Sequence, residues 1–152
     1  MNPVNESDQP VRLVVIDDDP KNLKMVSFTL SSGELEIHTA SDPRVGFDLI
    51  TRLRPQIVLI DLILPGIGGM ELLQQIVQLE WGIAVILMTG HNSPELAAQA
   101  IQLGAADYFP KPFSPSKLRE RIALIVEDKK RRQRSSTMDG IAEKQREALR
   151  EI

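Results

Sequence analysis

The chain has 152 residues, enough for one domain with a hydrophobic core and a short extension. It has no cysteine, which excludes disulfides and thiolate metal sites, and no apolar run approaches the roughly 20 residues that span a bilayer. We therefore expect a cytoplasmic protein without membrane contact. Residues 1–128 hold 10 Lys and Arg against 17 Asp and Glu, whereas residues 129–152 hold 8 against 4. Because the first part is acidic, we expect no direct binding to nucleic acid.

Short runs rich in Val, Ile and Leu predict strands, and the longer segments between them, with apolar residues three and four apart, predict helices. The predicted strands are Arg12–Asp17, Leu35–Ala40, Ile57–Asp61, Ile83–Thr89 and Ala106–Pro110. This alternation indicates an α/β fold, a doubly wound parallel sheet built from five βα units. We expect the flavodoxin-like strand order 2-1-3-4-5, followed by a C-terminal helical extension.

Most of the predicted helix starts carry a side-chain acceptor followed by proline. These pairs are Asp19-Pro20, Asp42-Pro43, Ser93-Pro94 and Ser114-Pro115. The acceptor caps the helix, and proline suits the first helical position because its missing N–H has no intrahelical partner. The remaining helix is predicted near Met70–Glu80, after the run Gly66–Gly69. That run lacks the Lys-Ser/Thr ending of a P-loop and follows the third strand, so we interpret it as a flexible turn.

The last residues predict a second, basic segment. We expect the fifth helix to continue through Lys129–Arg134, a break at Ser135–Gly140, and a further segment from Ile141 to Ile152 with a weak apolar stripe. The basic run is interpreted as a solvated helix or linker rather than a contact for an acidic partner. Three interpretations of the last segment stay open: pairing with a second copy or docking on a partner, a disordered end, or the start of an output region.

Polar residues stand at the ends of the predicted strands, where sites form in open α/β sheets. They are Asp17, Asp18, Asp61, Thr89 and Lys111. Three clustered carboxylates repel one another unless they hold a divalent cation, and hard oxygen ligands favour Mg²⁺. In such a site Asp61 can attack phosphorus, while Lys111 and Thr89 stabilise phosphoryl oxygens. The sequence therefore predicts phosphoryl transfer with Asp61, Lys111 and Thr89 as the catalytic residues.

Four segments in order carry a resemblance to a known family: Leu13–Pro20, Ile57–Gly66, Val85–His91 and Gly104–Phe113. Over residues 11–127 the chain resembles the receiver domain of bacterial two-component response regulators. The sequences of Met88–His91 and Lys111–Phe113 are also similar to those of receivers attached to enhancer-binding transcriptional regulators. We accordingly predict, in chain order, a disordered N-terminus at 1–10, a receiver domain at 11–127 and a basic helical linker or tail at 128–152.

The resemblance implies a role for each matching site residue. Asp61 would be the phosphoacceptor, and Asp18 and Asp61 would bind Mg²⁺ directly together with the main-chain carbonyl of Ile63, with Asp17 acting through water. Thr89 and Tyr108 would form the switch pair. Ile63 and His91 would flank the phosphoryl group and modulate its lifetime; because Ile63 offers no water-positioning group, we expect slow self-dephosphorylation. The Lys111-Pro112 bond is expected to be cis.

The resemblance also implies partners and an output. The phosphoryl group would come from a histidine kinase or a histidine phosphotransfer protein, and the chain would catalyse only its own phosphorylation and dephosphorylation. Phosphorylation would change the face formed by helix 4, strand 5 and helix 5, which would control an output in signal transduction and transcription regulation. The same face would allow a homodimer.

Two other classes of function compete with a signalling switch. A phosphohydrolase can also use an Asp nucleophile with Mg²⁺, Thr and Lys, but such enzymes usually carry a second acid two residues after the nucleophile. That position is Ile63 here, which argues against turnover of external substrates. A structural adaptor that never takes phosphate is disfavoured because every expected site residue is present.

Overall fold

The computed structural model of the chain describes residues 9–64, 66–90 and 93–150. Its strands form one parallel five-stranded sheet in the order β2-β1-β3-β4-β5, which confirms the predicted fold class and strand order. The strands are β1 Val11–Ile16, β2 Leu35–Ala40, β3 Ile57–Asp61, β4 Ala84–Thr89 and β5 Asp107–Pro110. Their bounds differ from the predicted ones by at most one residue. Of the predicted N-terminal segment 1–10, all but Gln9 and Pro10 lie outside the described residues.

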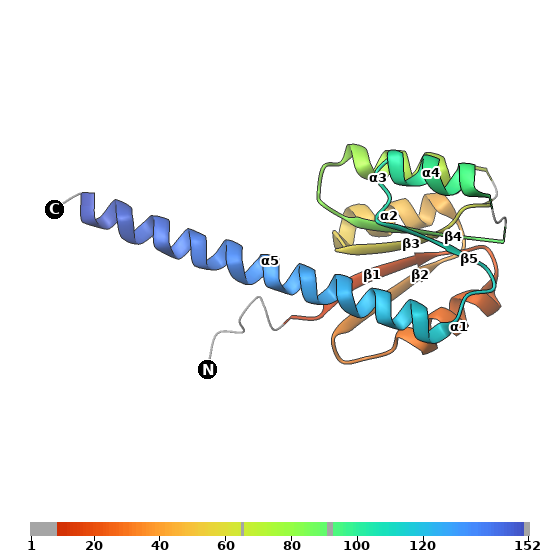
Figure 1. The fold of residues 1–152 in the computed structure, drawn as a ribbon, viewed down its shortest axis with the longest axis horizontal. Helices are drawn as coiled ribbons and strands as arrows, with labels where there is room; N and C mark the ends of the chain where they lie inside the picture. Colours follow the sequence, from red (N-terminus) through yellow and green to blue (C-terminus); the bar gives the residue numbers. More distant parts are fainter. Residues whose placement is uncertain (1–8, 65, 91–92, 151–152) are drawn as a thin grey trace.

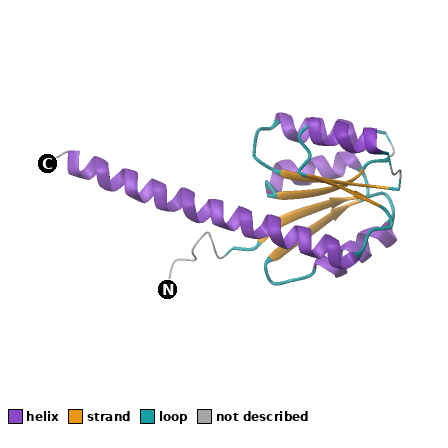
Figure 2. Cartoon of the chain, in the orientation of Figure 1, coloured by secondary structure: helices purple, strands orange, loops and turns teal. Residues whose placement is uncertain are grey.

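Helices cover both faces of the sheet. They are α1 Pro20–Leu30, α2 Pro43–Leu53, α3 Gly69–Gln78, α4 Pro94–Gln102 and α5 Pro115–Arg150. Figure 1 shows α1 and α5 on one face and α2, α3 and α4 on the other, and Figure 2 shows the sheet enclosed between these two layers. None of the helices in the described ranges combines the length and apolar character needed to cross a membrane.

Successive side chains along the central strands point to opposite faces of the sheet, which divides the core into two layers. In β3, Val58 and Ile60 belong to the cluster beneath α2, α3 and α4, whereas Ile57 and Leu59 belong to the cluster beneath α1 and α5. All these side chains are fully buried, which explains why β3 is apolar without interruption until Asp61. Each large apolar side chain buried in this way contributes about 1.5–3 kcal/mol, so the end of β3 is held firmly.

The proline-marked helix starts are confirmed. The Asp19 side chain accepts a hydrogen bond from the Lys21 N–H, that of Asp42 accepts from the N–H groups of Arg44 and Val45, and that of Ser93 accepts from the Leu96 N–H. In each case proline is the first helical residue, and α5 likewise begins at Pro115. These caps fix where the chain turns from strand to helix, at the same edge of the sheet as the polar strand ends.

The predicted break at Ser135–Gly140 is wrong, because α5 is one helix of 36 residues. The segment contains no proline, and its other residues weaken a helix by at most about 1 kcal/mol each, so they do not end it. Figure 1 shows the second half of α5 extending well beyond the sheet. Where α5 leaves the domain, the Lys129 amine donates a hydrogen bond to the Gly82 carbonyl, and Lys130 lies 3.9 Å from Glu34.

Candidate functional site

A lysine joins two carboxylates at the carboxyl edge of the sheet. Lys111 follows β5, and its Nζ lies 3.0 Å from Oδ2 of Asp17 and 3.0 Å from Oδ2 of Asp61. The register places these groups together, because Ile16 pairs with Ile60 and Thr89 pairs with Pro110. The side chain of Lys111 therefore reaches past the end of β4, and three residues far apart in sequence meet as predicted.

Asp17 is completely buried and both of its carboxylate oxygens are engaged. Its Oδ1 accepts the N–H of Asp19 at 2.9 Å, while its Oδ2 accepts hydrogen bonds from Lys111 and from the side-chain amide of Asn22. Asn22 lies in the first turns of α1 and was not among the predicted site residues. The contact between Asn22 and Asp17 depends on how α1 packs over the end of β1. No local sequence pattern predicts this packing.

Asp61 ends β3 and is 8% exposed. Its Oδ1 accepts the Ile63 N–H at 3.1 Å. Burial raises the pKa of the Asp61 carboxyl above its ordinary value; the Ile63 N–H and Lys111 lower it, Asp17 raises it further, and the net direction is upward. For Lys111, burial lowers the pKa, but the hydrogen bonds that its amine donates to Asp17 and Asp61 outweigh burial and raise the pKa, so the amine is cationic at neutral pH.

The donor set fits a hard divalent cation. Asp17, Asp18 and Asp61 each place one carboxylate oxygen within 4.8 Å of the others, and Asp18 is exposed. Lys111 contacts two of these carboxylates, so the three together leave an excess of negative charge in a partly buried site. Carboxylates with a solvent-accessible side are the ligands of Mg²⁺, which keeps several of its waters. The predicted metal residues are therefore brought together.

The predicted switch pair lies on the neighbouring strands. Thr89 ends β4 and is completely buried, and its carbonyl accepts the Lys111 N–H. Tyr108 in β5 is half-buried and packs against the core cluster beneath α2, α3 and α4. The Lys111-Pro112 bond is cis, as expected.

The two predicted modulating positions differ in what the structure describes. Ile63 follows the phosphoacceptor candidate by two residues, and its side chain is 54% exposed beside the carboxylate cluster. His91 lies outside the described residues.

The family profile of the response regulator receiver domain matches residues 13–123. The chain belongs to this family. The match ends within the first turns of α5, so most of the long helix lies beyond it. The family assignment predicted from the sequence motifs is therefore confirmed.

Similar proteins include full regulators and isolated receivers. The C4-dicarboxylate transport transcriptional regulatory protein DctD of Pseudomonas aeruginosa is 35% identical over 127 residues, which cover 84% of this chain and 28% of that protein. The response regulator MprA of Mycolicibacterium vanbaalenii is 29% identical over 134 residues, covering 88% and 55%. The chain thus spans between about a quarter and about half of the length of these relatives.

Solved receiver structures share the fold. A signal receiver domain from Vibrio parahaemolyticus superposes with a TM-score of 0.77 at 26% identity, covering 86% of this chain and 97% of that one. A response regulator receiver domain protein from Clostridium thermocellum gives a TM-score of 0.73 at 30% identity, covering 79% and 97%.

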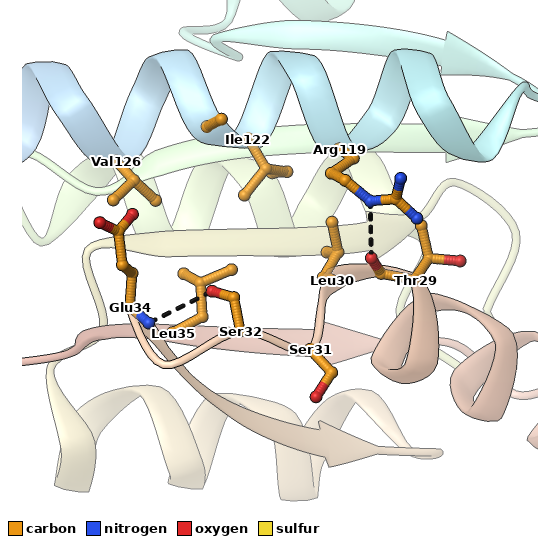
Figure 3. A pocket seen from close by; sticks show the side chains of 10 residues that line it. Thr29, Leu30, Ser31, Ser32, Glu34, Leu35, Arg119, Ile122 and Val126 are labelled. Carbon is orange, nitrogen blue, oxygen red and sulfur yellow. Dashed lines mark hydrogen bonds between the residues drawn. The ribbon is translucent and has the colours of Figure 1, made fainter.

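This receiver also has a hollow away from the carboxylates. A cavity of about 190 Å³ lies between the end of α1, the loop before β2, and α5 (Figure 3). Leu30 and Ile122 line it, and so does Arg119, whose guanidinium donates to the Thr29 carbonyl at 3.2 Å. None of the residues that form the carboxylate site lines it. The Arg119 contact attaches α5 to α1.

Proposed function

We infer that this receiver accepts a phosphoryl group on Asp61 from a phosphohistidine of a histidine kinase or a histidine phosphotransfer protein. One observation carries the proposal: a buried carboxylate at a strand end lies 3.0 Å from a lysine amine and within 4.8 Å of two further carboxylates. An isolated carboxylate at such a place is costly, whereas one surrounded by a cation and metal ligands is suited to nucleophilic attack on phosphorus.

In the transfer, a carboxylate oxygen of Asp61 forms a bond to phosphorus while the bond from phosphorus to the imidazole nitrogen breaks. The product is an acyl phosphate, and the histidine of the donor leaves as a neutral imidazole after taking up a proton. Lys111 stabilises the negative charge on the phosphoryl oxygens, and the Thr89 hydroxyl donates to one of them. The chain acts on its own phosphorylation and dephosphorylation only, not on external substrates.

Mg²⁺ is the cofactor of this proposal. Asp18, Asp61 and the main-chain carbonyl of Ile63 would hold the ion, with Asp17 acting through water. When bound, the ion supplies positive charge to the phosphoryl oxygens. The proposal is supported by the grouping of the three carboxylates and by the N–H of Ile63, which keeps that residue next to Asp61.

The output is a change on the face of α4, β5 and α5. Thr89 and Tyr108 act as the switch pair, and phosphorylation shifts the population between two packings of this face. We assign the receiver, residues 11–127, to a cytoplasmic signalling pathway that regulates transcription, because its relative DctD is a transcriptional regulatory protein. The α4-β5-α5 face would support a homodimer, and the acidic receiver itself would not bind nucleic acid.

Intact mass after incubation with acetyl phosphate tests the proposal. Wild type is expected to gain one phosphoryl group in the presence of Mg²⁺ and none in excess EDTA, and Asp61→Asn is expected to gain none. Asp48→Asn is the matched control, because Asp48 is exposed on α2 and its side chain makes no contact with the site. Folded wild type without an adduct, at early and late times, would favour a phosphate-independent adaptor.

A further inference from the structure

The first residue of α3 touches the end of β3 at the phosphoacceptor. Gly69 opens α3 and is buried, and its N–H donates to the Leu62 carbonyl at 2.8 Å. A Cβ at Gly69 would lie 2.5 Å from the Asp61 carbonyl oxygen, 2.7 Å from the Leu62 Cα and 2.9 Å from the Leu62 carbonyl oxygen. The turn predicted from the run Gly66–Gly69 therefore ends in a tight helix-to-strand contact.

The atoms in the way belong to the main chain, so no side-chain rotation can relieve the contact. Leu62 is itself held on the other side, where its N–H donates to the Met88 carbonyl at 2.8 Å. Any group larger than hydrogen at Gly69 must therefore move α3 away from the sheet or move the backbone of Asp61 and Leu62.

The contact also closes the loop that carries Ile63. The bond from Gly69 to Leu62 uses one of the N–H groups that have no partner within a helix, and it joins the two ends of the loop. Within the loop, the Ile63 N–H holds Asp61 Oδ1 at 3.1 Å. A displaced α3 would thus change two things together: the direction of the Asp61 carboxylate and the place of the Ile63 carbonyl.

We propose that Gly69 is a positioning residue, which sets Asp61 and the Ile63 carbonyl in register for Mg²⁺ binding and phosphoryl transfer by letting α3 abut the main chain of β3. The inference rests on the proposed function for its catalytic part. Its metal-binding part stands on the loop geometry and is measurable without any phosphoryl donor.

Gly69→Ala in the full chain is the test, with two glycine controls. Gly68→Ala adds the same methyl group one residue earlier, where a Cβ meets nothing within 4 Å. Gly82→Ala controls for lost stability, because Gly82 has φ of +70°, which strains a residue with a Cβ, and it lies in the loop between α3 and β4, at the opposite edge of the sheet from the carboxylates. Calorimetric titration with Mg²⁺ alone, the acetyl phosphate rate and urea unfolding are measured for all three.

Gly69→Ala is expected to weaken Mg²⁺ binding about tenfold and to slow phosphorylation by at least as much, as loss of groups that orient metal ligands usually does. Gly68→Ala keeps wild-type affinity and rate, and Gly82→Ala keeps both while losing stability. A folded Gly69→Ala with wild-type affinity for Mg²⁺ overturns the inference, and so does an equal loss of affinity in Gly82→Ala.

If Gly69→Ala does not fold, amide NMR of wild type decides. The Gly69 amide is expected to be protected from hydrogen exchange and to shift on Mg²⁺ addition, whereas the Gly68 amide is expected to exchange rapidly; an unprotected Gly69 amide overturns the inference. If wild type binds Mg²⁺ but takes up no phosphoryl group, the proposed function is wrong. The role of Gly69 in Mg²⁺ binding can still be measured in that case.

Discussion

The Lys111 amine lies 3.0 Å from Oδ2 of Asp61, so an ion pair links the ends of β5 and β3 across the end of β4. The same amine lies 3.0 Å from Asp17, and it is therefore the one cation among the described groups that contacts both buried carboxylates. Its charge offsets that of the two carboxylates in the folded site, and in the proposed function it would also stabilise an anionic phosphoryl group.

Replacing Lys111 by Met should lower the stability measured by urea unfolding in EDTA by about 2 kcal/mol, because two buried carboxylates lose their cation. Added Mg²⁺ should restore more stability to the variant than it adds to wild type, since it supplies the missing positive charge. Phosphorylation by acetyl phosphate should fall sharply. Lys117→Met, at an exposed position of α5, is the control and should behave as wild type. Equal stabilisation of both variants by Mg²⁺ would contradict the prediction.

Asp61→Asn should be more stable than wild type at neutral pH in EDTA. Burial raises the pKa of Asp61, so the stability that its protonated form contributes is complete below about pH 4 and is lost as the pH rises through the folded-state pKa. The unfolding free energy of the variant should therefore exceed that of wild type by an amount that increases with rising pH. Urea curves at several pH values measure it, with exposed Asp48→Asn as a flat reference. A wild type that is the more stable of the two at neutral pH would refute this expectation.

Asn22→Ala should weaken Mg²⁺ affinity by about tenfold, because the amide that orients the Asp17 carboxylate is removed. Helix α1 should keep its stability, since alanine favours a helix more than asparagine does. Calorimetric titration with Mg²⁺ measures the affinity. Lys24→Ala, an exposed change on the same helix, should leave it unchanged. An Asn22→Ala affinity equal to that of wild type would show that Lys111 and the Asp19 N–H hold Asp17 without help.

Ile63→Glu should shorten the phosphoryl lifetime by about tenfold or more, because an acid at this place can orient and activate water beside the acyl phosphate. Decay of the adduct mass after removal of the donor measures the lifetime. Val45→Glu introduces the same acid at an exposed apolar position of α2 and should leave the lifetime unchanged. A wild-type half-life of seconds would count against the role given to the apolar side chain.

Gly140→Ala should increase helix content, because glycine within a helix costs about 1 kcal/mol relative to alanine and Gly140 lies inside α5. Far-UV circular dichroism during heating should show the gain as a later loss of helical signal, without a shift in the unfolding of the receiver. Gly33→Ala, in a loop with open space around it, is the control and should not change helix content. An unchanged helical signal in Gly140→Ala would restore the break predicted from the sequence.

The sequence predicted the parts of the fold that depend on local signals. The strand β3 was recognised because its apolar run ends at Asp61, and the helix starts at Pro20 and Pro43 because cap and proline adjoin. Asp17, Asp61 and Lys111 were brought together in the prediction because parallel strands end at one edge, which the observed register confirms for this part of the site.

What the sequence did not predict depends on contacts between distant segments. Asn22 became a site neighbour only through the angle at which α1 crosses the end of β1, and the closeness of Gly69 to Asp61 only through the packing of α3 on β3. The continuity of α5 through Ser135–Gly140 was missed for another reason. Residues typical of turns suggest the end of a helix, although without proline they only weaken it.

The uninterrupted α5 gives the molecule a lever. From Val126 to Arg150 the helix adds about 36 Å at 1.5 Å per residue, so a tilt of about 10° at its root moves the far end by about 6 Å. A small displacement of the α4-β5-α5 face, which leaves the fold unchanged, would therefore be amplified along the helix. At the far end it would become a movement comparable to the width of a side chain.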